Sequence, residues 1–171
     1  MSTDKYGQTL LRIAADVCQS LFRDYGVVLR ELPDDDRAPS PMLLCGVVGF
    51  SGKGLRGSAI IGSSSEVLLA SNPAKNPQDR DWVGELANQF VGRIENELVK
   101  YGVEIFITTP VTLRGEHILP LGQHGLPRLV LEGPQGKVWV WLEVRFASTF
   151  RMLDKPDPRL GGPTEGETLL F

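Results

Sequence analysis

The sequence predicts an α/β sandwich of the α+β type, in which two main helices cover one face of a mixed, mostly antiparallel sheet. Two long stretches, residues 6–25 and 79–101, repeat apolar residues at helical spacing. Two others, residues 42–62 and 128–146, have the pattern of paired strands joined by short glycine-containing turns. Strands and helices do not alternate regularly, so a doubly wound parallel sheet is not expected.

The chain of 171 residues is long enough for one domain with a substantial core and too short for two comfortable ones. We expect a single domain over residues 1–153 and a flexible tail, rich in Pro and Gly, over residues 154–171. The net charge of -3 gives no electrostatic support for a nucleic-acid partner. No apolar run could span a bilayer and the first residues lack a secretion signal, so we expect a cytoplasmic protein without membrane insertion.

Neither the cysteines nor the histidines predict a cofactor site. Cys18 and Cys45 are far apart, each among apolar neighbours, as is typical of buried reduced thiols. His117 and His124 share one loop that has no carboxylate or cysteine at ligand spacing, which makes them weak metal candidates. We therefore expect no metal and no cofactor of the protein's own.

The first half of the chain predicts a helix, a short strand and a hairpin. Residues 6–25 form the helix, which Gly26 ends as a C-terminal cap. Residues 27–32 follow as a strand, and a loop rich in Pro and Asp separates it from the first hairpin. That hairpin pairs residues 42–50 with residues 55–62 across a glycine-rich turn.

The glycines of this turn come close to two catalytic motifs, and both fail. A phosphate-binding loop would need glycine where Val47 stands and Ser or Thr where Gly54 stands. A nucleophile elbow would need glycine in place of Lys53. Ser51 also has no His and acid partners that the sequence identifies, so a hydrolase with its own nucleophile finds little support.

The second half predicts a short helix over residues 66–71, in which Ser63 and Glu66 have capping-box spacing. The long helix over residues 79–101 follows it. Next comes a strand over residues 103–109, and Pro110 marks a bulge, a strand end or a sheet edge. A last hairpin pairs two strands across a turn at residues 133–136.

The long helix has two contrasting faces. Its inward stripe is apolar and comprises Val83, Ala87, Phe90, Ile94, Leu98 and Tyr101. Asp81, Glu85, Asn88 and Gly92 lie within about 60° of each other on the opposite side. Glycine in a helix interior costs about 1 kcal/mol relative to alanine, so an outward glycine suggests that an external surface approaches the backbone. From the pattern alone, an ordinary solvated face is the default explanation.

Glu85 and Asn88 are three residues apart, so their side chains lie side by side. A carboxylate can pair with a cation on a partner, and a carboxamide can both donate and accept hydrogen bonds and so orient a water molecule. Such a site works by positioning water, while the substrate brings the reactive group and any metal. An acidic metal site built from Asp79, Asp81 and Glu85 is an alternative interpretation.

Residues 84–115, GELANQFVGRIENELVKYGVEIFITTPVTLRG, resemble the CheC/CheX family of chemotaxis phosphatases, and CheX in particular. The family signature is an acidic residue or serine, three residues, glutamate, two residues, asparagine, and a proline after the following strand. Asp81, Glu85, Asn88 and Pro110 occupy these positions. The preceding hairpin resembles the family's paired strands, so the resemblance covers residues 46–115.

The resemblance implies a phosphatase, a hydrolase of two-component chemotaxis signalling that acts on the phospho-aspartate of a CheY-like response regulator. It implies that Asn88 aligns a water molecule and that Glu85 docks on a lysine of the partner, with Mg²⁺ held by the partner. Asp81, Gln89 and Gly92 would border the partner. Gln89 departs from the family pattern, because many relatives carry an apolar residue after the asparagine.

Only one such glutamate–asparagine site is present, which favours CheX over the two-site CheC pattern. The resemblance also implies a homodimer with joined sheet edges. The strand face carrying Trp139 and Trp141 would suit this interface, although a core role fits these residues equally well. The alternative function is a non-catalytic module with the CheX fold that binds a response regulator or serves as a homodimeric scaffold.

Overall fold

The structure is a computed structural model that describes residues 3–32, 44–74, 79–116, 118, 120 and 128–161. Within them lie the helices α1 (Thr3–Asp24), α2 (Ser65–Ser71) and α3 (Asp79–Val99). The strands are β1 (Arg30–Glu31), β2 (Leu44–Gly52), β3 (Leu55–Ser63), β4 (Ile105–Ile107), β5 (Val111–Arg114), β6 (Arg128–Gly133) and β7 (Gly136–Phe146), and a short 3-10 helix covers Pro158–Leu160.

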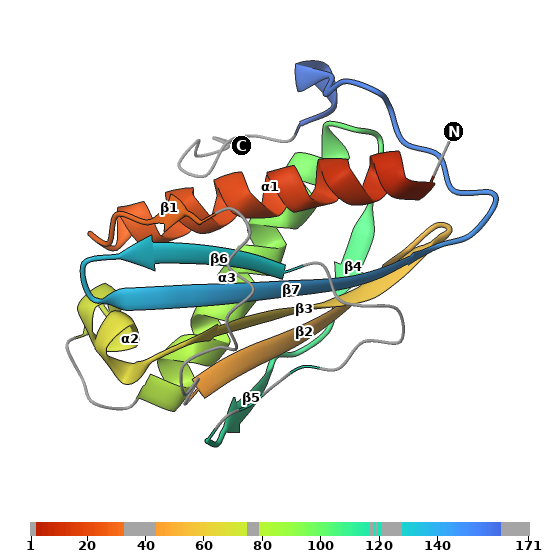
Figure 1. Cartoon of the computed structure of the whole chain (residues 1–171). Helices are drawn as coiled ribbons and strands as arrows, with labels where there is room; N and C mark the ends of the chain where they lie inside the picture. Colours follow the sequence, from red (N-terminus) through yellow and green to blue (C-terminus); the bar gives the residue numbers. More distant parts are fainter. Residues whose placement is uncertain are drawn as a thin grey trace, which may run out of the picture.

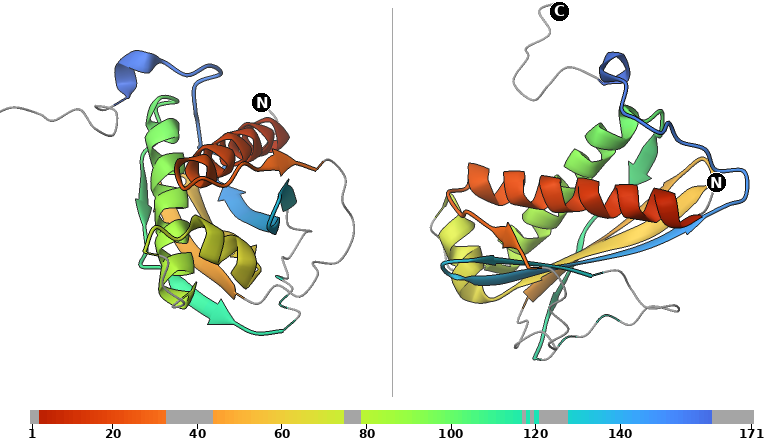
Figure 2. Two further views of the ribbon diagram at one scale, coloured as in Figure 1. Left: turned by 90° about the vertical axis from the view of Figure 1, so that its left-hand side faces the viewer. Right: turned by 45° about the horizontal axis from the view of Figure 1, so that its top comes forward.

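The strands form one sheet in the order β1-β6-β7-β3-β2-β4, and β5 also pairs with β2. Every pairing between described strands is antiparallel. Both long helices lie on the same face of this sheet (Figures 1 and 2). The predicted fold class and both predicted hairpins are therefore confirmed.

The strand expected over residues 27–32 is reduced to β1. Gly26 takes a positive φ of 79°, and the Val27 amide donates to the Phe22 carbonyl at 2.9 Å. Val27 therefore still belongs to the cap that ends α1 and cannot join a ladder. Pairing with β6 begins only at Arg30.

The strand expected over residues 103–109 is shortened for the same reason. Gly102 has a φ of 73°, and the Val103 amide closes the end of α3 by donating to Leu98 at 3.0 Å. Pro110 then separates β4 from β5, and both strands pair with β2. The predicted break at this proline is confirmed, and it divides one edge of the sheet into two short strands.

The capping box predicted between Ser63 and Glu66 does not form. Ser64, not Ser63, is the N-cap of α2, and its side chain makes no capping hydrogen bond. The Ser63 hydroxyl instead donates to the Lys137 carbonyl at 3.0 Å and so ties β3 to β7. The backbone amide of Glu66 and the hydroxyl of Ser64 hold the pKa of the Glu66 carboxyl below its ordinary value.

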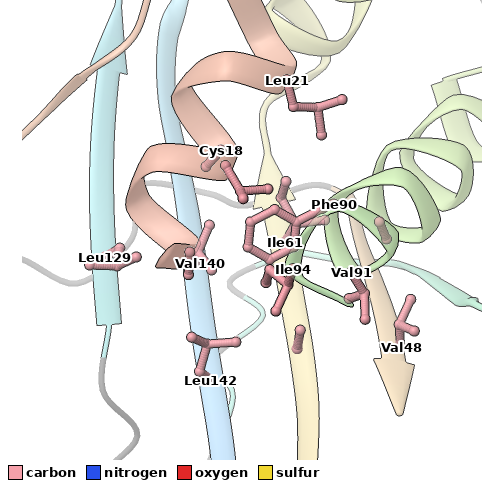
Figure 3. Close-up of a cluster of buried hydrophobic side chains, with 14 of the residues drawn as sticks. Cys18, Leu21, Val48, Ile61, Phe90, Val91, Ile94, Leu129, Val140 and Leu142 are labelled. Atoms are coloured by element: carbon pink, nitrogen blue, oxygen red, sulfur yellow. The ribbon is translucent and has the colours of Figure 1, made fainter. Parts of the chain in front are cut away.

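The helix-covered face of the sheet holds the main core. Cys18 and Leu21 of α1 and Phe90 and Ile94 of α3 belong to one buried cluster with Val140 and Ile61 of the sheet (Figure 3). Burial of this kind contributes about 1.5–3 kcal/mol for each large side chain. The core consequently fixes both helices against one sheet face.

The opposite face of the sheet carries a smaller cluster that includes Cys45, Val130, Trp139 and Trp141. The two tryptophans are 5% and 3% exposed, so the core role is the one they have within the chain. Both cysteines are buried free thiols, as predicted. Burial raises the pKa of each, and Cys18 is the more enclosed of the two.

The start of the expected tail contacts the body of the domain. The Asp157 amide donates to the Lys100 carbonyl at 2.7 Å, and Lys5 pairs with Asp154 at 2.8 Å. Residues 162–171, His117 and His124 lie outside the described residues. None of the described helices has the length and apolar character that crossing a membrane requires.

Candidate functional site

The inner side of α3 confirms the predicted apolar stripe. All six predicted members of the stripe are buried, with 4% or less of each exposed, although the last of them follows the end of α3: Val83, Ala87, Phe90, Ile94, Leu98 and Tyr101. Burial of one continuous stripe sets which side of the helix faces the sheet. The outward side is set at the same time.

Two glycines bring α3 unusually close to the sheet. A Cβ atom added at Gly46 of β2 would lie 2.5 Å from the Ala87 Cβ and 2.8 Å from the Val83 carbonyl oxygen. One added at Gly84 of α3 would lie 3.0 Å from the Thr112 hydroxyl of β5. The helix therefore rests on β2 and β5 with little freedom to rotate or shift. The sequence analysis missed this contact, although a glycine inside a strand is a known signal of close backbone approach.

The outward residues of α3 lie together on one face, as the spacing predicts. Asp81 and Glu85 are exposed, and Asn88 and Gly92 are half-buried. A Cβ added at Gly92 would meet nothing within 4 Å, so packing inside the chain does not require this glycine. Among the described residues, no hydrogen bond or ion pair of the Asn88 side chain is found, and its carboxamide can serve an external group.

Gln89, the residue after Asn88, links this face to the end of α1. Its Nε2 donates to Glu85 Oε1 at 2.8 Å, and its Oε1 accepts a hydrogen bond from the Tyr25 hydroxyl at 2.8 Å. Tyr25 directly follows α1 and is 64 residues away in sequence. No sequence pattern indicated this contact, because it depends on how the two helices pack.

The end of α1 is itself held in place. The Tyr25 ring meets Trp82 edge-on, with centroids 4.8 Å apart and planes at 89°. The Trp82 indole donates to the Ser71 hydroxyl at 2.9 Å, and Asp24 pairs with Arg93 at 2.8 Å. The tyrosine is thus fixed by contacts with the same helix that carries the candidate site.

The site provides charge and hydrogen bonding but no activated nucleophile. Two exposed carboxylates can attract a cation, and one carboxamide can orient a water molecule. Within the described part of the chain, no group of three or more His, Cys, Asp and Glu side chains could hold a metal ion. The Asp79 side chain, one member of the alternative acidic site, lies outside the described residues.

A family model described as the chemotaxis phosphatase CheX matches residues 44–131, a segment that contains the entire candidate site. The chain belongs to the CheX family. The matched segment runs from the first hairpin through α3 to β6, and so includes each position of the signature quoted above. A search among curated proteins found no match.

Solved structures show the same fold. The chemotaxis protein CheX from Vibrio vulnificus is 19% identical with a TM-score of 0.64, covering 80% of this chain and 96% of its own. CheX from Desulfovibrio desulfuricans is 17% identical with a TM-score of 0.63, covering 81% and 97%. A complex of CheX with CheY, BeF3 and Mg²⁺ from Borrelia burgdorferi is 18% identical with a TM-score of 0.57, covering 79% and 97%.

Proposed function

We propose that this CheX-family protein is a phosphatase that dephosphorylates the phospho-aspartate of a CheY-like response regulator. The proposal rests on the positions of Glu85 and Asn88, which lie on one outward face of a helix that is fixed against the sheet. The Borrelia burgdorferi complex supports the choice of partner, because it contains a member of this family bound to CheY.

In the proposed reaction, the Asn88 carboxamide accepts a hydrogen bond from a water molecule in line with the phosphorus–aspartate bond. The water oxygen forms the new bond to phosphorus, and the bond to the aspartate oxygen breaks. Inorganic phosphate leaves with the protons of the water, and the aspartate regains its carboxylate. The carboxamide contributes by orientation, which is a large share of catalysis in phosphoryl transfer.

The other residues of the face serve docking in this proposal. Glu85 pairs with a lysine of the receiver domain, and Asp81 flanks it one turn earlier. Gly92 gives a broad protein surface access to the helix backbone, and Gln89 borders the same surface. The receiver brings Mg²⁺, so the chain needs no cofactor of its own. Homodimer formation and a cytoplasmic location stay predictions.

The test is phosphate release from a phosphorylated CheY-like receiver domain encoded in the same genome. Wild-type protein at substoichiometric amounts should accelerate the loss of phosphate, and Asn88→Ala should not. A circular dichroism melt would verify that the variant is folded. Binding without acceleration, over several such receivers, would contradict the phosphatase proposal and favour a non-catalytic response-regulator-binding or scaffold module.

A further inference from the structure

The Glu85 carboxylate is part of a short hydrogen-bonded chain that begins on another element. The Tyr25 hydroxyl donates to Gln89 Oε1, and Gln89 Nε2 donates to Glu85 Oε1, each at 2.8 Å. The glutamine is half-buried, whereas the glutamate is exposed. These two hydrogen bonds therefore connect the fixed end of α1 to the solvent-facing side of α3.

The chemistry of the three groups allows only one arrangement of the glutamine amide. A carboxylate accepts hydrogen bonds and cannot donate them, so Gln89 must turn its amino group toward Glu85. The amide oxygen then faces Tyr25, whose hydroxyl can donate to it. Tyr25 consequently supports the very orientation of Gln89 that Glu85 requires, and each hydrogen bond strengthens the other.

We infer that Tyr25 and Gln89 are positioning residues that hold Glu85 ready to receive a cationic side chain of the partner receiver domain; this inference rests on the proposed function. Only Oε1 is engaged by Gln89, which leaves the second carboxylate oxygen for the incoming cation. Ordering a flexible side chain opposes association, and a side chain that is already ordered avoids this loss. The carboxamide of Asn88, which orients the water, takes no part in these hydrogen bonds. Tyr25 and Gln89 therefore affect docking of the receiver domain and not the chemical step.

The test compares variants that remove single hydrogen bonds. Gln89→Met keeps the length and helix propensity of the side chain but loses the amide, and Tyr25→Phe loses only the hydroxyl. Gln89→Met should raise the receiver concentration that gives half-maximal phosphate release about two- to tenfold, the range expected for ordering one such side chain. Tyr25→Phe should change it in the same direction by less, and the maximal rate should stay unchanged in both. Gln8→Met on α1 is the matched control and should change neither value.

A double-variant comparison separates positioning from general stability. In a Glu85→Ala background, Gln89→Met should cause no further loss of apparent affinity, because the group that it positions is gone. An unchanged half-saturating concentration in Gln89→Met would overturn the inference. So would an equal loss with and without Glu85, or a fall in maximal rate alone.

Failure of this inference can be told apart from failure of the proposed function. Titration of the beryllofluoride-activated receiver measures docking without turnover. If wild type binds but does not accelerate phosphate release, the phosphatase proposal fails, and weaker binding by Gln89→Met still supports the positioning role. If wild type neither binds nor turns over any receiver of the genome, both proposals are overturned.

Discussion

Helices α1 and α3 pack on the same face of the sheet, but the glutamate–asparagine pair of the CheX signature lies on α3, and the described sequence of α1 contains neither residue type. Two outward hydroxyls of α1 bond to their own helix, since Thr9 donates to the Lys5 carbonyl and Ser20 to the Val17 carbonyl, both at 3.0 Å. For Asn88 of α3, no such hydrogen bond is found among the described residues. Exposure alone is therefore a poor guide to function, because a polar side chain that bonds to its own backbone is less available to a partner.

The two helices also differ in how closely their backbones meet the rest of the molecule. The glycine of α1, Gly7, has open space around it, whereas Gly84 of α3 lies against Thr112 and Gly46 lies against Ala87. Close approach limits rotation of α3 and so holds its outward residues in one direction. Substitutions can test this contrast. Helix α3 is tightly seated and has an available carboxamide, whereas the hydroxyls of Thr9 and Ser20 on α1 bond to their own helix.

The largest expected effect is the loss of activity in Asn88→Ala compared with Ser20→Ala. Each substitution removes an outward polar group from one of the two long helices. Asn88→Ala should reduce the acceleration of phosphate release about 100-fold, as is typical when a reacting water is no longer oriented. Ser20→Ala should leave the rate unchanged in the same assay. Equal rates for Asn88→Ala and wild type would remove the distinction between the helices.

The close approach of α3 predicts that Gly46→Ala is destabilising. The added methyl group would meet Ala87 and the Val83 carbonyl, and backbone atoms cannot move aside without shifting the helix. We expect a loss of about 1–3 kcal/mol in the free energy of unfolding, the range for overpacked cores. Urea denaturation measures it, with Gly7→Ala as the control at an open site. A Gly46→Ala variant as stable as wild type would show that α3 is not seated tightly.

The buried thiol of Cys18 on α1 predicts that the free energy of unfolding depends on pH. Burial raises the pKa of this thiol, so the folded protein keeps the proton while the unfolded chain ionises near the ordinary value of 9.0. The contribution of the protonated thiol to the free energy of unfolding is complete below about pH 9. It is lost as the pH rises further, by about 1.4 kcal/mol per pH unit. Between pH 8 and pH 10, wild type should lose about 1.4 kcal/mol more stability than Cys18→Ala. Parallel losses in urea titrations would contradict the prediction.

The smallest expected effect concerns the two open glycines of the helices, Gly7 and Gly92. Alanine should stabilise the protein by up to about 1 kcal/mol at either position, because nothing lies within 4 Å of the new Cβ. Only Gly92→Ala should weaken binding of an activated receiver domain, since only that glycine lies on the proposed docking face. Thermal unfolding and receiver titration measure the two effects. Equal affinities for both variants would leave Gly92 without a role in docking.

Much of the architecture follows from local patterns. Helical spacing predicts both long helices and the buried stripe of α3, and alternation predicts the two hairpins and the two faces of β7. The strands next to Gly26 and Gly102 are shorter than expected because the residue after each glycine donates its amide to the end of the preceding helix. A cap of this kind competes with strand pairing for one backbone group, and alternation of side chains carries no signal of that competition.

By itself, the sequence determined which side of α3 is polar and which residues share it, because side chains three or four positions apart on a helix are neighbours in any fold. Only the tertiary structure decided that Trp139 and Trp141 are buried, that α3 is seated on Gly46, and that Tyr25 reaches Gln89. These contacts join segments that are distant along the chain. They depend on the relative placement of the helices and the sheet, which is set by packing of the whole core and not by any local repeat.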